Sequence, residues 1–164
     1  MARAALGLGS NLGDRRSFLA AAVHRLGEAG PVVAVSSLYE TAPVGGPPQG
    51  SFLNAVVVVD TTLGPRRLLE LAQVVEREAG RRRLVRWGPR SLDVDLLLYE
   101  GPPVEEPGLR VPHPRLTARR FALEPLVEAW PGAALPDGTL AASLLPAVTD
   151  QDARVVAGPG WWEG

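Results

Sequence analysis

The chain carries four valines in a row at residues 56–59, inside the apolar segment 52–61. β-Branched side chains lose rotamer freedom in a helix and pack well on a pleated surface, so such a run favours a strand. We therefore predict a central strand over residues 52–61. A lone strand is not stable in water, and the rest of the chain must supply its neighbours.

Five further segments have the hydrophobic spacing of a strand or a helix. Strands are expected at residues 3–8, 32–39 and 92–99, and helices at residues 15–28 and 65–79. Asp14 is the expected N-cap of the first helix, and Pro65 suits the first position of the second. The glycine-rich residues 9–14 and the glycine- and proline-rich residues 40–51 are predicted to be loops.

The order strand, helix, strand, strand, helix, strand is the βαββαβ pattern of an α+β, ferredoxin-like antiparallel sheet with both helices on one face. Residues 100–164 are expected to add C-terminal pieces, including helices around residues 123–130 and 140–147. No linker or internal repeat divides the chain, and 164 residues suit one domain, so we expect a single domain over residues 1–164.

The composition excludes several kinds of chemistry. The chain has no cysteine, and all 17 basic residues are arginine. Thiol nucleophiles, lysine Schiff bases and the ordinary P-loop are therefore excluded. A net charge of −1 gives no reason to expect nucleic acid or an anionic membrane as a partner. Charged residues come too early for a secretory signal, and a cytoplasmic location is expected.

Five arginines fall within ten residues, without an acid among them: Arg81, Arg82, Arg83, Arg86 and Arg90. A run of charge is by itself most often a solvated loop. Gly80, Gly88 and Pro89 also indicate a loop rather than a helix face. The alternative is a grip on a polyphosphate, because each guanidinium can bind two oxygens at once.

Asp93 and Asp95 follow this arginine tract on a predicted strand. Alternation places both carboxylates on one face, with their α-carbons about 7 Å apart. Leu92, Val94 and Leu96 should point into the core. The pair is either two exposed acids on a wet face or a site for Mg²⁺, which prefers oxygen ligands. A cation beside an arginine loop would suit phosphoryl transfer.

The segment Arg86-Trp87-Gly88-Pro89-Arg90-Ser91-Leu92-Asp93-Val94-Asp95 resembles the signature of 6-hydroxymethyl-7,8-dihydropterin pyrophosphokinase, a folate-biosynthesis enzyme family. Three further segments agree in order and spacing: Gly9-Ser10-Asn11-Leu12-Gly13, Phe52-Leu53-Asn54-Ala55 and Val111-Pro112-His113. The resemblance implies transfer of diphosphate from ATP to the hydroxymethyl group of the pterin, with release of AMP.

The resemblance also implies site residues. Two magnesium ions would be held by Asp93 and Asp95. Catalytic roles are implied for Arg81 and Arg90 beside these aspartates. ATP would be bound by Gln73, Glu76, Arg83, Arg90, Arg110, His113 and Arg119. The pterin would lie between Phe52 and Phe121, near Thr41, Ala42, Pro43, Val44, Asn54, Trp87 and Asp93.

A rival interpretation is a ferredoxin-like regulatory module that binds a small molecule or nucleotide without catalysis. Such a module needs no carboxylate pair, and an RNA-binding sheet would carry aromatic residues where this chain has valines. We expect ATP and the pterin as partners of a monomer. Trp161 and Trp162, near the C-terminus, either cover an apolar patch or support self-association.

Overall fold

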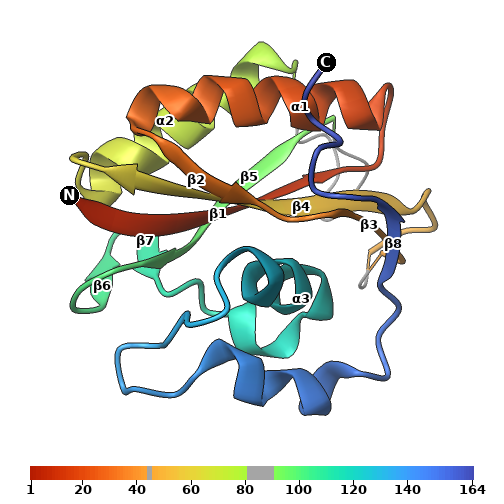
Figure 1. The fold of residues 1–164 in the computed structure, drawn as a ribbon. Coiled ribbons are helices and arrows are strands. Elements are labelled where there is room, and N and C mark those ends of the chain that lie inside the picture. Colours follow the sequence, from red (N-terminus) through yellow and green to blue (C-terminus); the bar gives the residue numbers. More distant parts are fainter. Residues whose placement is uncertain (44–45, 81–90) are drawn as a thin grey trace.

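The computed structural model describes residues 1–43, 46–80 and 91–164. Its centre is an antiparallel sheet with the strand order β5–β1–β4–β3–β8, in which β2 also pairs with β4 (Figure 1). The strands are β1 (Ala2–Ser10), β2 (Val32–Val35), β3 (Leu38–Thr41), β4 (Phe52–Thr61), β5 (Asp93–Tyr99) and β8 (Arg154–Ala157). A separate hairpin is formed by β6 (Val104–Glu106) and β7 (Leu109–Val111). The prediction of a mixed fold with an antiparallel sheet is confirmed.

The valine run lies where the sequence placed it, in a strand with the predicted bounds. Strand β4 is buried from Leu53 to Val59, and it pairs with β1 on one side and with β2 and β3 on the other. Strand β1 is longer than predicted, since it includes Gly9 and Ser10, for which the sequence predicts a loop. Both continue the ladder with β4, and Gly9 also pairs with Asp93 on β5. Hydrogen bonding on both sides overrides the weak strand preference of glycine.

The predicted strand at residues 32–39 is wrong, because two strands, β2 and β3, occupy this region. Ser36 interrupts the ladder: its hydroxyl accepts a hydrogen bond from the Val56 amide at 2.9 Å and donates one to the Ser37 carbonyl at 2.7 Å. The Ser37 amide donates to the carboxylate of Glu128 at 3.0 Å. At this break in the ladder, side-chain oxygens therefore replace backbone carbonyls as the acceptors for backbone N–H groups.

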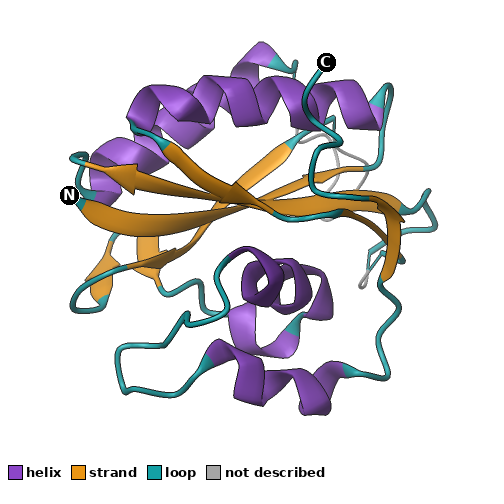
Figure 2. Cartoon of the chain, in the orientation of Figure 1, coloured by secondary structure: helices purple, strands orange, loops and turns teal. Residues whose placement is uncertain are grey.

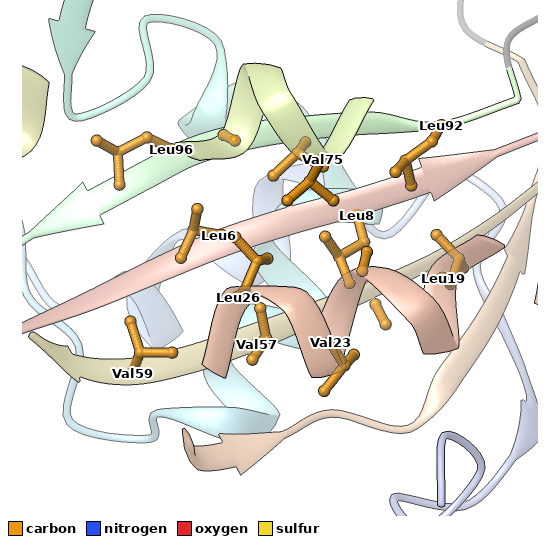
Figure 3. Close-up of a cluster of buried hydrophobic side chains, with 14 of the residues drawn as sticks. Leu6, Leu8, Leu19, Val23, Leu26, Val57, Val59, Val75, Leu92 and Leu96 are labelled. Carbon is orange, nitrogen blue, oxygen red and sulfur yellow. The ribbon is translucent and has the colours of Figure 1, made fainter. Parts of the chain in front are cut away.

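Two helices cover one face of the sheet, α1 (Arg15–Leu26) and α2 (Pro65–Glu78) (Figures 1 and 2). Asp14 caps α1 as predicted, accepting a hydrogen bond from the Ser17 amide at 3.2 Å. The apolar sides of both helices meet the sheet in one core, where Leu19, Val23 and Leu26 point toward β1 and β4 (Figure 3). A short helix η1 (Gly27–Ala29) follows α1.

The opposite face is covered by later parts of the chain, namely η2 (Leu116–Ala118), α3 (Arg120–Ala129) and η3 (Ala141–Val148) (Figure 2). Helix α3 begins three residues before the predicted helix at 123–130, because Arg119 ends η2 and directly starts α3. A second core unites α3 with the sheet through Val56, Val58, Leu123 and Leu126. Within the described residues, no helix is long and apolar enough to cross a membrane.

The last strand, β8, lies at the sheet edge beside β3. After it the chain turns back over the α1 side, where Trp161 is only 5% exposed and belongs to the first core. Its indole N–H donates to the Ser36 carbonyl at 2.9 Å. Trp162 meets His24 edge to face, with 5.2 Å between ring centroids. Trp161 therefore covers an apolar patch of its own chain, which is the first of the two alternatives given for the tryptophans.

Gly30 gives a test of the packing between η1 and β4. Its φ is +151°, and a Cβ built there would lie 1.9 Å from the Asp60 carbonyl oxygen. Gly30→Ala should therefore lower the free energy of unfolding by about 2–4 kcal/mol. Urea denaturation measures the change. Gly132→Ala is the control, because nothing lies within 4 Å of its Cβ position; equal stability of the two variants would contradict this account.

Candidate active site

A pocket of about 350 Å³ opens on the α3 side of the sheet. Strands β1, β4 and β5 provide its floor. One wall is the segment from η2 into α3, and the other is formed by Thr41 at the end of β3 and Phe52 at the start of β4. The lining residues are Gly7, Leu8, Gly9, Thr41, Ala42, Pro43, Gln49, Phe52, Asn54, Ala55, Asp93, Asp95, Leu97, Arg115, Ala118, Arg119, Phe121 and Ala122. The pocket thus gathers segments that are far apart in the sequence.

Two glycines on β1 form the middle of the floor. Gly7 pairs with Asp95 and Gly9 with Asp93 on β5, while on the other side Gly9 pairs with Asn54 of β4. Residues directly opposite each other project from the same face of an antiparallel pair, so any side chain at Gly9 would stand in the pocket. A Cβ there would lie 2.9 Å from Oδ1 of Asn54. Because Gly7 and Gly9 have no side chains, the space between the aspartates and β4 is open.

The carboxylate pair has the predicted alternation. Asp93 and Asp95 are partly exposed and line the pocket, whereas Leu92, Val94 and Leu96 between and beside them are buried. The Glu76 carboxylate on α2 accepts a hydrogen bond from the Val94 amide at 2.9 Å. Among the described residues, no group of three or more His, Cys, Asp or Glu side chains could hold a metal. Any cation here would rely on this pair, on substrate oxygens and on water.

Aromatic and amide groups also line the pocket. Phe52 begins β4, and Phe121 lies in the first turn of α3. The guanidinium carbon of Arg119 lies 5.3 Å from the Phe121 ring centroid. Asn54 Nδ2 donates to Thr41 Oγ1 at 2.5 Å, and both residues are buried. This bond fixes the amide, so its oxygen acts as an acceptor on the side of Gly9.

His113 lies beside the pocket without lining it. Its backbone N–H donates to the Leu97 carbonyl at 2.9 Å, and its Nδ1 accepts from the Arg115 amide at 3.1 Å. The second bond requires Nδ1 to be unprotonated, which leaves the proton of the neutral ring on Nε2. Burial lowers the pKa of His113, and the positive charges of Arg119 and Arg115 lower it further.

Other predicted residues lie outside the pocket lining. Gln73 is exposed on α2, and Arg110 on β7 forms an exposed ion pair with Glu105 at 2.6 Å. Five predicted site residues are outside the described part of the chain: Val44, Arg81, Arg83, Trp87 and Arg90. The predicted residues that the pocket does bring together are Thr41, Ala42, Pro43, Phe52, Asn54, Asp93, Asp95, Arg119 and Phe121.

Sequence reasoning missed Gly7, Gly9, Gln49 and Arg115 as lining residues. The glycines carried a signal, since Gly7 and Gly9 alternate with the apolar Leu6 and Leu8 at strand spacing. Arg115 follows the predicted His113 by two residues. Gln49 had no such signal, because it sits in an irregular loop, where its side-chain oxygen accepts from Asn11 Nδ2 at 2.8 Å.

Comparison with known proteins identifies this arrangement. The family model for 7,8-dihydro-6-hydroxymethylpterin-pyrophosphokinase (HPPK) matches residues 5–131. The chain belongs to this family. Bacillus subtilis 2-amino-4-hydroxy-6-hydroxymethyldihydropteridine pyrophosphokinase is 50% identical over 125 residues, which cover 75% of each chain. The Pseudomonas aeruginosa enzyme of the same name is 44% identical over 148 residues, covering 88% of this chain and 91% of the relative.

Solved structures agree with the fold. A crystal structure of Plasmodium falciparum HPPK-DHPS, a triple mutant with pteroate, superposes with a TM-score of 0.68 at 17% identity. The match covers 88% of this chain and 43% of that chain, so the pyrophosphokinase spans less than half of this larger relative. At this identity the similarity concerns the fold alone.

Family membership decides between the two interpretations of the sequence. This HPPK transfers diphosphate from ATP to the hydroxymethyl group of 6-hydroxymethyl-7,8-dihydropterin, in folate biosynthesis. The enzyme is an ATP-dependent pyrophosphokinase with ATP as co-substrate. The alternative interpretation, a regulatory module without catalysis, is therefore wrong.

The environment of His113 predicts its titration. In the free enzyme, the histidine proton signals should show a midpoint below the ordinary pKa of 6.5. The unfolded chain then binds more protons than the folded enzyme near that pH, so stability falls as the pH drops through 6.5. NMR titration measures the midpoint, with His113→Gln to assign the signal. A midpoint above 6.5 in the free enzyme would contradict the described surroundings.

Proposed function

We propose that the pocket binds the dihydropterin between Phe52 and Phe121 and places its hydroxymethyl group toward Asp93 and Asp95. One observation carries this proposal: a single cavity is lined by two aromatic side chains and by two carboxylates from the same face of β5. A flat ring with apolar faces and a polar edge suits such a cavity. The other substrate, ATP, then approaches from the carboxylate side.

Asn54 and Thr41 would read the polar edge of the pterin. The pterin edge carries an amino group and ring nitrogens, which need both donors and acceptors. Because Asn54 Nδ2 is bonded to Thr41, the Asn54 oxygen is oriented to accept from the ligand. Ala42 and Pro43 line the same pocket. Val44 and Trp87, outside the described residues, remain predicted pterin contacts.

Asp93 and Asp95 would hold two magnesium ions. The donor set fits, because two carboxylates on one face of β5 offer hard oxygen ligands and leave positions for phosphate oxygens and water. Bound magnesium supplies neutralisation of the triphosphate charge and acidifies a coordinated hydroxyl group. Glu76 positions this pair from below, since its carboxylate holds the amide of Val94 between the two aspartates.

Two arginines of the pocket lining and the neighbouring His113 would bind the phosphates. Arg119 and Arg115 line the pocket, and the Nε2–H of neutral His113 can donate to a phosphate oxygen. Contacts of ATP with Gln73 and Arg110 remain predictions, as do those with Arg83. The roles of Arg81 and Arg90 in catalysis also remain predictions.

In the reaction, the pterin hydroxymethyl oxygen forms a bond to the β-phosphorus of ATP, and its hydroxyl proton is lost to water. The bond from that phosphorus to the oxygen bridging the α- and β-phosphates breaks, and AMP leaves with that oxygen. The two rings and the Asn54 amide hold the attacking oxygen in line with the bond that breaks. Arg119 stabilises charge on the transferred group. Positioning and electrostatics provide most of the catalysis in phosphoryl transfer.

We also infer that the chain is one ferredoxin-like domain with C-terminal additions and acts as a monomer. The order β5–β1–β4–β3, with α1 and α2 on one face, supports the topology. The sheet is continuous from β5 to β8, which supports one domain. The burial of Trp161 within its own chain supports a monomer, because this side chain needs no second copy to cover it.

The carboxylate proposal is tested with Asp95→Asn. Loss of this ligand should lower kcat by about a thousandfold at saturating Mg²⁺, because the triphosphate charge is no longer neutralised. The melting temperature should change little, since Asp95 is partly exposed. The assay follows AMP formed from ATP and the pterin. Glu70→Gln, at an exposed carboxylate on α2 outside the pocket lining, is the control; normal turnover by Asp95→Asn would contradict the proposal.

The aromatic sandwich is tested with Phe121→Leu. An aliphatic side chain fills most of the volume but cannot stack on the pterin, so the KM for the pterin should rise about tenfold. The KM for ATP should stay within about twofold, since stacking does not involve the nucleotide. Steady-state kinetics with each substrate varied in turn separates the two. An unchanged pterin KM would place the pterin elsewhere.

A further inference from the structure

The C-terminal residues 149–162 lie beyond the stretch 5–131 that the family model matches, yet they contact both walls of the pocket. On the α3 wall, Gln151 Oε1 accepts from the Arg120 amide at 3.0 Å, and its Nε2 donates to the Ala118 carbonyl at 2.8 Å. Arg120 Nη1 also donates to the Gln151 carbonyl at 2.7 Å. Gln151 thus holds the turn whose neighbours, Arg119 and Phe121, line the pocket.

Three residues later the same segment reaches the opposite wall. Strand β8 pairs with β3, and Arg154 stands opposite Glu40 and forms an ion pair with its carboxylate. Glu40 also accepts from Ser51 Oγ at 3.2 Å and lies 3.4 Å from Arg15 Nη1. The carboxylate therefore joins the end of β3 to the start of β4, immediately before the lining residues Thr41 and Phe52.

The far end of the segment is fixed in the first core. Trp161 is buried, its indole is bonded to Ser36, and its carbonyl accepts from Arg16 Nη2 at 3.1 Å. The segment is therefore held beyond β8 as well as before it. Gln151 and Arg154 are the points at which it meets the two pocket walls.

We propose that Gln151 and Arg154 are positioning residues for the pterin, which together tie the Phe121 wall to the wall formed by Thr41 and Phe52. The proposal rests on the proposed pterin site. A planar ligand between two rings needs a fixed separation of those rings, because dispersion contacts weaken within a fraction of an ångström. A tie outside the pocket can set that separation without touching the ligand.

A purely structural role would have different consequences. Arg154 is 73% exposed, and an exposed ion pair contributes little to the free energy of unfolding. Two independent local supports would also have additive effects on binding. A single tie, in contrast, is lost when either end is released, so a second substitution adds little. Additivity of the effect on pterin KM therefore distinguishes the two roles.

The experiment compares Gln151→Ala, Arg154→Glu and the double variant in the full-length enzyme. Gln151→Ala removes the side-chain bonds to the Ala118 carbonyl of η2 and the Arg120 amide of α3, and Arg154→Glu places a like charge opposite Glu40. The matched control is Arg66→Glu, because Arg66 pairs with Glu106 at 2.9 Å on a surface that does not line the pocket. Arg154→Lys keeps the positive charge and should restore most of the wild-type KM. Melting temperatures are recorded for every variant.

We expect each single substitution to raise the pterin KM about tenfold, with kcat reduced less than about threefold. The double variant should not exceed the worse single variant by more than about twofold. Arg66→Glu should leave the pterin KM unchanged. The tie is refuted if the single variants keep a wild-type pterin KM, if their effects multiply in the double variant, or if Arg66→Glu raises the KM equally.

Phe121→Leu, assayed in parallel, separates this proposal from the one on which it rests. If Phe121→Leu raises the pterin KM while the Gln151 and Arg154 variants do not, the tie alone is refuted. If none of these variants changes the pterin KM, the pterin site itself is assigned wrongly, and the tie falls with it.

Discussion

The antiparallel pairing of β1 with both β4 and β5 is the constraint on which the site depends. It sets Asp93 and Asp95 on one side of two glycines and Asn54 on the other. A shift of one residue in either register would turn the aspartates or Asn54 to the opposite face, into the core beneath α1 and α2. The same register that buries Leu6 and Leu8 under those helices therefore opens the pocket on the other face.

The local features of the fold were predictable from the sequence. The valine run, the Asp14 cap and Pro65 at the start of α2 each depend on a few neighbouring residues, and each is where expected. The break at Ser36 was not predictable in the same way. Its partners are Val56, 20 residues away, and, through Ser37, Glu128, 91 residues further along the chain. Local sequence patterns do not predict contacts between residues so far apart.

The site residues also include some that short-range patterns predict and some that they do not. Alternation alone placed Asp93 and Asp95 on one face, and the family resemblance supplied Phe52 and Phe121, which are 69 residues apart in sequence and line one pocket. Gly7 and Gly9 were not predicted because they contribute to the pocket by lacking a side chain, not by supplying a functional group. A glycine in a strand gains meaning only when its cross-strand neighbours are known, and these follow from the register rather than from the sequence around it.

The two walls of the pocket come from different elements of the fold, and this explains why a tie between them has a physical purpose. Phe52 begins a strand that is anchored in the sheet, whereas Phe121 sits in the first turn of a helix packed on the far face. Glu128 near the end of α3 accepts from the Tyr39 hydroxyl at 2.7 Å, and burial together with that carboxylate raises the pKa of Tyr39. This hydrogen bond fixes one end of α3 against β3. At the end that carries Phe121, the Gln151 side chain accepts from the Arg120 amide and donates to the Ala118 carbonyl, and so holds the first turn. Because Phe121 projects from the first turn of α3, support at that turn controls the separation of the two rings more directly than support elsewhere on the helix.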